Sequence, residues 1–229
     1  MDIVGGMVGL ALTAPLYPVI AAAIRLESRG PIFYRQRRAG GHPTPEGNAA
    51  EDLKVFDMLK FRTMVPDAEK KTGVVLAQAG DPRITRVGKF LRRTRLDEIP
   101  QFVNVLKGDM SIVGPRPERP ELIRDLAMAI PMFEERTRMV RPGITGLAQV
   151  SLDYAGRMDS SNALSSMKDE LLNPFKLEGA DDALADDMRT KLLYDVAYSA
   201  ALEDFWTWLR TDVEIIVKTP YVMVAGKGR

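Results

Sequence analysis

The longest apolar run of the chain covers residues 3–24 and contains no charged side chain. A helix of about 20 apolar residues is long enough to cross a bilayer. Pro15 and Pro18 interrupt the run, and a proline removes a backbone donor and clashes with the preceding turn. The pattern therefore predicts two apolar arms joined at a break at Ala14 and Pro15. Thr13 could bond a carbonyl that the break frees.

The flank of this run is basic, with arginines at positions 25, 29, 35, 37 and 38. Basic flanks favour the cytoplasmic, anionic face of a membrane. Two short arms joined at a kink suit a re-entrant helix that enters and leaves by the same face. A straight membrane span and a buried core helix of a soluble protein are the alternatives, although the run is long for a core helix.

Two later segments, PIFYRQR at 31–37 and VFDMLKF at 55–61, are predicted to be the two strands of a short β-hairpin. The polar residues 42–53 between them predict a long tip. The chain is therefore expected to have an α+β fold that is mostly helical. We expect a membrane part at residues 1–30 and a catalytic part at residues 31–229.

The remaining pattern is mainly helical and is punctuated by glycine and proline. Asp81 is expected to cap a helix that Pro82 opens, and Gly108 is expected to end another. The expected helices are 82–91, 98–107, 120–139 and 188–217. The expected irregular parts are a rigid loop at 111–121, a turn and then a short strand at 140–150, and a polar surface insertion at 159–190.

Composition excludes several classes of function. The 229 residues carry 32 basic and 31 acidic side chains, a balance that argues against a general nucleic-acid binder. The absence of cysteine excludes disulfides, zinc fingers and iron–sulfur clusters. The single histidine, His42, cannot build a multi-histidine metal site, and a Ser–His triad is equally disfavoured. The chemistry that remains for this chain would use carboxylates, arginines, lysines and a hard cation.

The stretch 92–100 carries the strongest chemical signal. Pro100 belongs in the first turn of a helix, which places Asp97 near the N-cap and Glu98 beside it. Three arginines precede the two acids. Carboxylates beside arginines suit Mg²⁺ and phosphate together. The alternative is structural: Asp97 caps the helix, Glu98 complements the helix dipole, and the arginines form a solvated face.

Other segments carry weaker signals for an anion site. Lys60 and Arg62 end the second strand, and Arg116 stands between two prolines. The turn 141–146, which includes Thr145, has glycines that could expose backbone amides. The P-loop pattern G-x-x-x-x-G-K-[ST] and the Rossmann pattern G-x-G-x-x-G do not occur.

Together these segments resemble the bacterial sugar transferase family, the monotopic polyprenol-phosphate phosphoglycosyl transferases. The resemblance lies in TAPLYPVIAAAIRLESRGPIFYRQRRAG, LKFRTM, DPRITRVGKFLRRTRLDEIPQFVNVLKGDMSIVGPRPERPE, VRPGITGLAQV and KLLYDVAY, in the family's order. It departs at the break, where the family usually has Ser-Pro and this chain has Ala14-Pro15. It also departs at the tip 42–53 and after LAQV, where the sequence is longer than usual.

The resemblance implies transfer of a phospho-sugar from a UDP-sugar to polyprenol (undecaprenyl) phosphate, with release of UMP. Asp97 would be the nucleophile that forms an aspartyl phospho-sugar, Glu98 would assist, and both would hold Mg²⁺. The implied substrate-binding residues are Lys60, Arg62, Arg92, Arg116, Arg141, Thr145, Arg157 and Asp195. Among them, Arg157 is a candidate for an arginine that often follows LAQV, and Asp195 matches a recurring aspartate without an assigned role.

The resemblance also implies a place in the cell and a set of partners. The expected location is the cytoplasmic face of the bacterial inner membrane, in contact with membrane lipids. The product would start a polysaccharide or glycoconjugate that downstream glycosyltransferases extend. A homodimer is an open option, and no nucleic acid is expected. Trp206 and Trp208 fit either an amphipathic interfacial helix or core packing.

Two other hypotheses compete with transfer. A non-catalytic membrane scaffold would bind UDP-sugars or glycosyltransferases without turnover. A UDP-sugar pyrophosphatase would release UMP without the lipid acceptor. UMP release in the presence and absence of that acceptor distinguishes all three.

Overall fold

The structure is a computed structural model that describes residues 1–41, 54–66, 68, 81–130, 132–138, 140–152 and 182–225. The chain divides into two packing units: Met1–Gln36 with Asp57–Gly108, and Arg37–Phe56 with Asp109–Arg229. The fold is mostly helical with a short antiparallel hairpin, as the α+β prediction requires. The expected division at residue 30 into a membrane part and a catalytic part stays a prediction.

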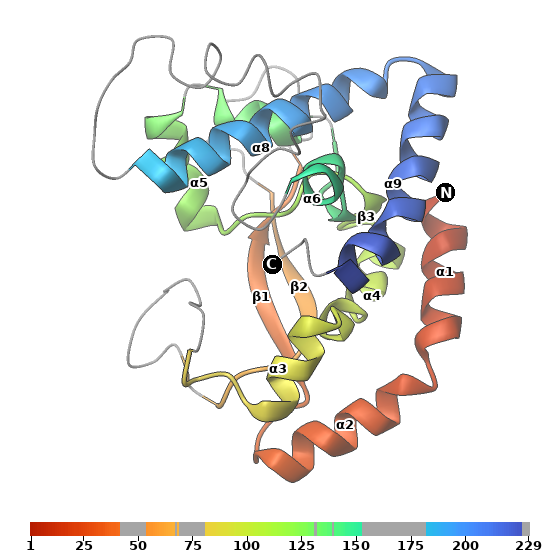
Figure 1. Ribbon diagram of the computed structural model, residues 1–229, viewed down its shortest axis with the longest axis vertical. Coiled ribbons are helices and arrows are strands. Elements are labelled where there is room, and N and C mark those ends of the chain that lie inside the picture. The colour runs from red at the N-terminus through yellow and green to blue at the C-terminus, as the bar shows by residue number, and fades with distance from the viewer. Residues whose placement is uncertain are drawn as a thin grey trace. The chain divides into compact units, whose positions relative to one another are not determined.

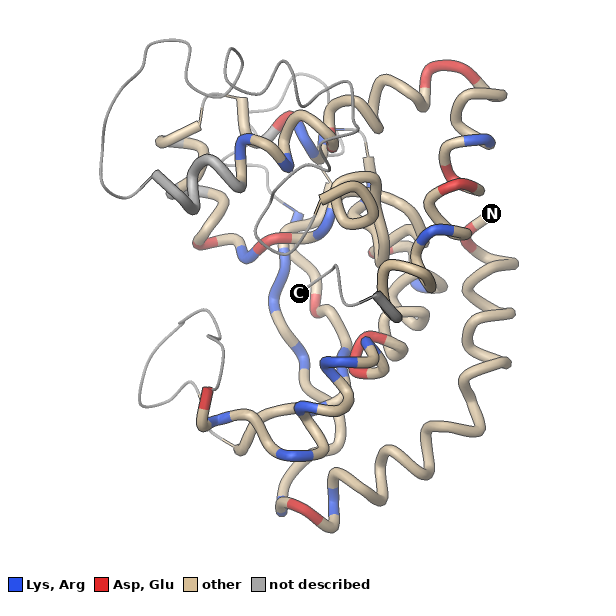
Figure 2. The backbone as a smooth tube through the Cα atoms, viewed as in Figure 1, with Lys and Arg blue, Asp and Glu red and all other residues tan. Residues whose placement is uncertain are grey.

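The first unit begins with two helices, α1 (Asp2–Thr13) and α2 (Leu16–Glu27), which meet at a bend of 60° (Figure 1). The break predicted from Pro15 is confirmed. Thr13 donates its hydroxyl to the Gly9 carbonyl at 2.7 Å, as expected of a threonine before a break. No charge lies between the first turn of α1 and the C-terminal end of α2 (Figure 2).

Within the described residues, no single helix combines the length and apolar content of a membrane span. The bent pair α1 and α2 meets that criterion together, by length and composition. Two glycines bring α1 close to α4 (Gln101–Lys107). A Cβ at Gly9 would lie 2.6 Å from the Phe102 ring, and one at Gly6 would lie 3.0 Å from Leu106. Larger residues at these positions would push the two helices apart.

The hairpin pairs β1 (Phe33–Ala39) with β2 (Val55–Phe61). The second strand has the predicted bounds. The first begins two residues later than predicted, since Pro31 has no N–H for a ladder. Phe61 lies in the core of the first unit, where it meets the bent helices. The buried members of that core are Ile20, Ile24, Phe61, Leu91 and Ile99.

Helix α3 (Arg86–Arg93) begins later than the sequence predicted. The N-cap is Thr85, whose hydroxyl accepts from the Gly88 amide at 2.9 Å. Asp81 is not the cap, because its carboxylate binds the backbone and guanidinium of Arg83. The Glu27 carboxylate also accepts from two amides in the first turn of α3, which joins the end of α2 to α3.

A short 3-10 helix, η1 (Leu96–Glu98), precedes α4. The helix predicted at 98–107 therefore starts at Gln101, with Pro100 at its N-cap. Its predicted end is confirmed, because Gly108 adopts a φ of 80° at the C-cap.

Among its described residues, the second unit contains a parallel strand pair and five helical segments. Strand β3 (Ser111–Val113) pairs with β4 (Gly143–Thr145) in the register Ser111 to Gly143. The helical segments are α5 (Pro120–Ala129), η2 (Phe133–Thr137), α6 (Leu147–Ser151), α8 (Asp182–Ala201) and α9 (Phe205–Ala225).

Five predictions for this unit need correction. The helix predicted at 120–139 is interrupted, because α5 ends at Ala129 and Met132 adopts a left-handed φ of 62° before η2 begins. Residues 111–113 are a strand rather than loop, because they pair with a distant segment. In 140–150 the strand comes first and a helix follows it. The C-terminal helix breaks into α8 and α9 after residue 201, and α8 takes in the end of the predicted insertion at 159–190. The tip 42–53 and the rest of that insertion lie outside the described residues.

Candidate active site

Asp97 and Glu98 lie in η1, between α3 and α4, and are 6% and 7% exposed. The capping alternative for Asp97 is wrong, because neither η1 nor α4 has a side-chain cap at its N-terminus. The Oδ1 atom of Asp97 is buried and has no hydrogen-bond partner. Buried polar atoms are nearly always bonded, so an unpartnered carboxylate oxygen calls for an explanation, and a bound ion or substrate would supply one.

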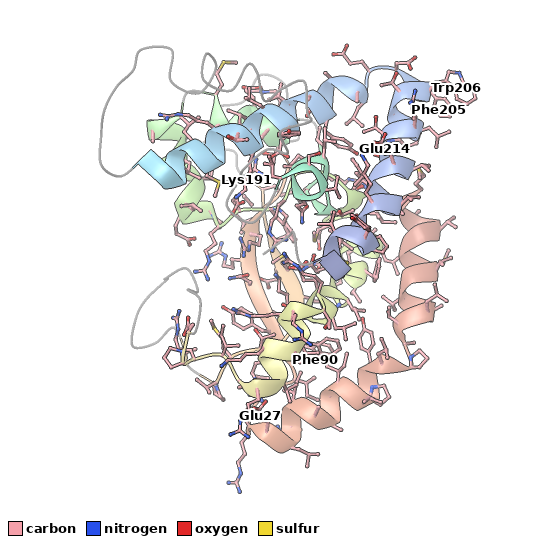
Figure 3. The ribbon with its side chains drawn as sticks, viewed as in Figure 1. Glu27, Phe90, Lys191, Phe205, Trp206 and Glu214 are labelled. Carbon is pink, nitrogen blue, oxygen red and sulfur yellow. The ribbon has the colours of Figure 1, made fainter. Side chains whose placement is uncertain are left out.

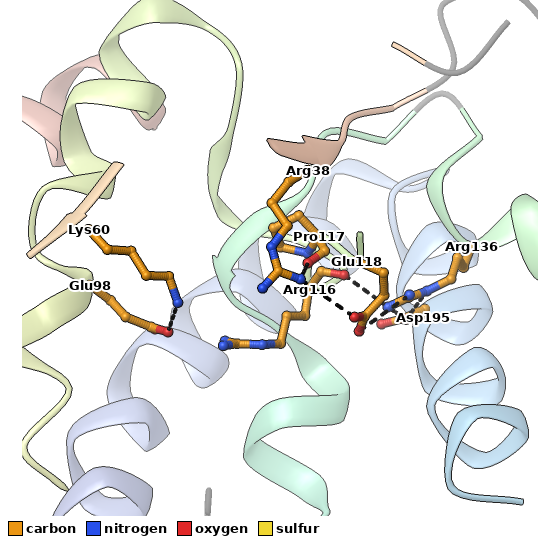
Figure 4. Close-up of polar contacts among 8 residues, drawn as sticks. All are labelled: Arg38, Lys60, Glu98, Arg116, Pro117, Glu118, Arg136 and Asp195. Carbon is orange, nitrogen blue, oxygen red and sulfur yellow. Dashed lines mark hydrogen bonds and ion pairs between the residues drawn. The ribbon is translucent and has the colours of Figure 1, made fainter. Parts of the chain in front are cut away.

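Glu98 differs from its neighbour because it has a cationic partner. Lys60 of β2 donates from Nζ to Glu98 Oε1 at 2.8 Å (Figure 4), and Arg95 lies 3.8 Å from the same oxygen. Arg95 adopts the left-handed conformation, with φ 56°, which turns the chain into η1. The predicted dyad therefore combines an ion-paired carboxylate at Glu98 with a neighbouring carboxylate, Asp97, of which one oxygen has no hydrogen-bond partner.

Burial raises the pKa of the Asp97 carboxyl above its ordinary value, and the adjacent Glu98 carboxylate raises that pKa further. The positive charges of Lys60, Arg92 and Arg95 act in the opposite direction. Arg92 is held near this site by its Nε, which donates to the Thr63 hydroxyl at 2.9 Å. The site thus combines a desolvated carboxylate with nearby cations that favour its charged form.

A buried asparagine fixes the strand that carries Lys60. Asn104 of α4 is 1% exposed, donates to the Asp57 carbonyl at 2.8 Å and accepts from the Leu59 amide at 2.9 Å. Sequence reasoning missed this residue. The signal was present as one amide side chain within the apolar helix face QFVNVL.

Arg62 points to a different use from the predicted substrate contact. Its guanidinium donates to the carbonyls of Ser28 and Arg29 at 2.7 and 3.0 Å, and the side chain is 6% exposed. These carbonyls follow the C-terminus of α2, where helices leave acceptors unpaired. In this structure Arg62 ties the end of α2 to β2.

The other predicted residues belong to the second packing unit, apart from Arg157, which lies outside the described residues. Arg116 is half-buried, and Arg141 is exposed beside β4. The buried Thr145 hydroxyl bonds to the Thr219 hydroxyl at 2.7 Å. Within this unit, Asp195 of α8 is 1% exposed and therefore offers no open carboxylate to a substrate.

The partner of Asp195 is Arg136 of η2, which sequence reasoning also missed. Arg136 is 2% exposed, and its Nε and NH2 atoms lie 2.8 and 2.7 Å from Asp195 Oδ2 (Figure 4). Glu118 lies 3.8 Å from Arg136 NH1. Burial raises the pKa of Asp195, and the Arg136 guanidinium opposes that rise. The local sequence FEERTR has no apolar pattern that would mark one arginine as buried.

No group of three or more histidine, cysteine or acidic side chains could hold a metal ion in the described part of the chain. Asp97 and Glu98 supply two carboxylate groups as hard oxygen ligands. Mg²⁺ in phosphate-transfer sites usually binds one or two carboxylates and completes its shell with substrate phosphates and water. The unpaired Asp97 Oδ1 fits such an ion, and the predicted cation stays a prediction.

Comparison with known proteins agrees with this chemistry. Residues 1–226 match the family described as Bacterial sugar transferase. The chain is 38% identical over 228 residues to the UDP-N-acetylgalactosamine-undecaprenyl-phosphate N-acetylgalactosaminephosphotransferase of Aeromonas hydrophila, covering 100% of this chain and 44% of that protein.

Two further relatives are UDP-glucose:undecaprenyl-phosphate glucose-1-phosphate transferases. The one from Caulobacter vibrioides is 45% identical over 150 residues, covering 66% of this chain and 52% of the relative. The one from Escherichia coli is 44% identical over 159 residues, covering 69% of this chain and 32% of the relative. The chain thus spans between 32% and 52% of the length of these relatives. It belongs to the bacterial sugar transferase family.

Proposed function

We propose that the chain transfers a sugar 1-phosphate from a UDP-sugar to undecaprenyl phosphate and releases UMP. The observation that carries the proposal is the unpaired, buried Oδ1 of Asp97 beside the ion-paired Glu98. The names of the relatives support the same reaction class and differ in the sugar.

In the first step, an Asp97 oxygen attacks the phosphorus that bears the sugar. The new bond joins this oxygen to phosphorus, and the bond from that phosphorus to the bridging oxygen breaks, so UMP leaves with the bridging oxygen. In the second step, an oxygen of undecaprenyl phosphate attacks the same phosphorus. The Asp97 carboxylate is released, and the sugar phosphate is now part of a lipid diphosphate. A positioned, desolvated carboxylate is a better nucleophile than one in water.

The cations of the first unit support this role. Lys60, Arg92 and Arg95 bring positive charge to the carboxylates, where an attack on a diphosphate gathers negative charge. Lys60 also holds Glu98 in place beside Asp97. Arg116 and Arg141 are the proposed diphosphate contacts from the second unit. Asp97 and Glu98 would hold Mg²⁺, which supplies further neutralisation of phosphate charge when bound.

A membrane location follows from the lipid acceptor and from exposed apolar side chains. The outer faces of α1 and α2 expose Ile3, Val4, Leu12, Val19 and Leu26, with exposed fractions between 65% and 88%. We infer that this bent pair is re-entrant and lies in the cytoplasmic leaflet of the bacterial inner membrane.

The beginning of α9 supports an interfacial helix. Phe205 and Trp206 point outward from the helix (Figure 3), and Trp206 is 73% exposed. The Trp208 ring lies 5.5 Å from the Phe205 ring. Exposed aromatic rings are typical of the membrane–water boundary, which favours the interfacial reading of Trp206 over core packing.

The test is a panel of UDP-sugars with the full chain in lipid nanodiscs, Mg²⁺ and undecaprenyl phosphate, scored by UMP release. We expect one or a few UDP-sugars to release UMP in excess of the enzyme only when the lipid acceptor is present, because the first step alone yields at most one UMP per chain. Asp97→Asn should abolish release, while Asp57→Asn, at an exposed aspartate of the same unit, should not. Release of more than one UMP per chain without acceptor would indicate a pyrophosphatase, and binding without UMP would indicate a scaffold. Either result would overturn the proposal. If the transfer occurs as proposed, downstream glycosyltransferases would extend the lipid-linked product.

A further inference from the structure

The segment 114–118 joins β3 to α5 without forming a helix or a strand, yet each of its five residues is fixed by another segment of the second unit. The Gly114 amide donates to the Thr145 carbonyl at 2.9 Å. The Pro115 carbonyl accepts from the Gly143 amide, also at 2.9 Å. β4 therefore holds the start of the segment.

The end of the segment is held by β1. The Glu118 carbonyl accepts from the Ala39 amide at 2.9 Å, and the Pro117 carbonyl accepts from Arg38 NH1 at 3.0 Å (Figure 4). The middle residue has its own donor, because Arg136 NH2 bonds to the Arg116 carbonyl at 3.1 Å. Five consecutive residues are thus fixed by three different elements.

Arg116 and Glu118 are the half-buried residues of this segment, and Arg116 is its one basic residue. Gly114, Pro115 and Pro117 are buried, whereas Arg116 is half-buried. The prolines on both sides restrict the backbone conformations of the segment at Arg116, which limits the directions in which the Arg116 side chain can leave the backbone. A guanidinium presented on such a segment is pre-organised for an anion.

Burying the Arg136–Asp195 pair removes two charges from water. The free energy of this desolvation can exceed the attraction between the two charges, so the pair does not necessarily stabilise the fold. Its geometry shows what it holds: one guanidinium contacts the Asp195 carboxylate and the Arg116 carbonyl through the same NH2 group. The Phe133 ring lies 5.0 Å from the guanidinium carbon and covers it. Arg136 cannot rotate away from Asp195 without releasing Arg116.

We infer that Asp195 and Arg136 are positioning residues for Arg116. Asp195 fixes the guanidinium of Arg136, Arg136 fixes the Arg116 carbonyl, and the segment presents the Arg116 side chain to a diphosphate. This inference rests on the proposed function, in which Arg116 contacts the UDP-sugar. Asp195 then affects the reaction without touching the substrate.

A double-mutant cycle on the full chain tests the inference, with KM and kcat for UMP release as readouts. We expect Asp195→Asn to lower kcat/KM about tenfold, mainly through KM, because a displaced contact weakens substrate binding. In an Arg116→Gln background the same change should have no further effect, since residues that act as one unit are not additive. An equal loss in both backgrounds would overturn the inference, because Asp195 would then act independently of Arg116.

A second variant covers the case in which Asp195→Asn fails to fold. Arg38→Gln removes the donor to Pro117 at a side chain that is 13% exposed. It should also raise KM, and only when Arg116 is present. Arg138→Gln is the matched control, because it breaks an ion pair with Glu135 beside Arg136. It should leave KM unchanged, and a KM change as large as that of Arg38→Gln would overturn the inference.

Hydrogen exchange supplies a readout that does not depend on turnover. The amides that donate in the bonds holding this segment, those of Gly114, Ala39 and Gly143, should exchange faster in Asp195→Asn and in Arg38→Gln than in the wild type. Unchanged exchange in both would overturn the positioning role. A wild-type chain that releases no UMP would overturn the proposed function alone, and the exchange rates would still decide whether these residues position Arg116.

Discussion

Asp97 of the first unit and Asp195 of the second are both buried aspartates whose pKa burial raises, but their partners differ. Asp195 Oδ2 lies within hydrogen-bond distance of two nitrogens of Arg136. Asp97 Oδ1 has no partner, because the nearby Lys60 pairs with Glu98 instead. An unpaired buried acceptor costs about 1–3 kcal/mol. The comparison indicates one carboxylate that holds the fold and one that the fold leaves available for chemistry.

The largest effect is expected from Asp97→Asn. We expect kcat for UMP release to fall by about 10³-fold or more, because the nucleophile is removed. Thermal stability should not fall, since the amide replaces a desolvated charge that lies beside Glu98. An unfolding midpoint that falls together with activity would contradict the comparison, because Asp97 would then be a structural residue.

The pH dependence of the stability of Asp97→Asn follows from the raised pKa of the Asp97 carboxyl in the folded protein. A carboxyl whose pKa is higher in the folded than in the unfolded state destabilises the fold as pH rises between the two values. The amide does not titrate. The stability advantage of Asp97→Asn over the wild type should therefore grow from about pH 4 towards neutral pH, as thermal unfolding would show.

The opposite outcome is expected for Asp195→Asn. Removal of this charge leaves the guanidinium of Arg136 buried with only the more distant Glu118 as an acidic neighbour among the described residues. We expect the folded state to lose about 3 kcal/mol. Thermal unfolding beside Asp57→Asn measures the difference, and an unchanged midpoint would show that the pair is not needed to hold the fold.

Lys60→Met should sharpen the comparison through the pH profile of the reaction. The charge of Lys60 lowers the pKa of Asp97, so its loss should raise that pKa. The acid limb of kcat/KM against pH should then move to higher pH, because the nucleophile must be ionised. Lys107→Met, at an exposed lysine of α4, is the matched control and should leave the limb in place. If the acid limb does not move in Lys60→Met, Lys60 has no influence on the ionisation of Asp97.

The smallest effect is expected from Glu118→Gln. Glu118 lies 3.8 Å from both Arg38 and Arg136, longer than a hydrogen bond. We expect a stability change below about 1 kcal/mol, in contrast to that of Asp195→Asn. A loss as large as that of Asp195→Asn would mean that the Arg136 charge is balanced by both acids together.

Local signals in the sequence were sufficient for the elements that depend on single residues. The prolines at 15 and 18 predicted the break between α1 and α2, and Gly108 predicted the end of α4. Elements that depend on distant partners were not predictable in this way. Strand β3 exists because β4 pairs with it from thirty-odd residues away, and no local pattern in SIV indicates that pairing.

The candidate site shows the same limit. The neighbouring acids at 97 and 98 stand out in the sequence because two charges precede a helix-opening proline. The different partners of these two acids cannot be read from the sequence, because Lys60, which pairs with Glu98, lies 38 positions away. Arg136 was missed for a related reason: a buried arginine and an exposed one read alike until a carboxylate from another helix is placed beside it.

The packing of the bent helices has a practical consequence for making the protein. Ile20 and Ile24 of α2 share a core with Phe61, Leu91 and Ile99, and the glycines of α1 receive Phe102 and Leu106 of α4. Cutting the chain at residue 30 to obtain a water-soluble fragment would therefore remove packing partners of α4 and of the core next to Asp97 and Glu98. Expression work should keep the first thirty residues and solubilise them.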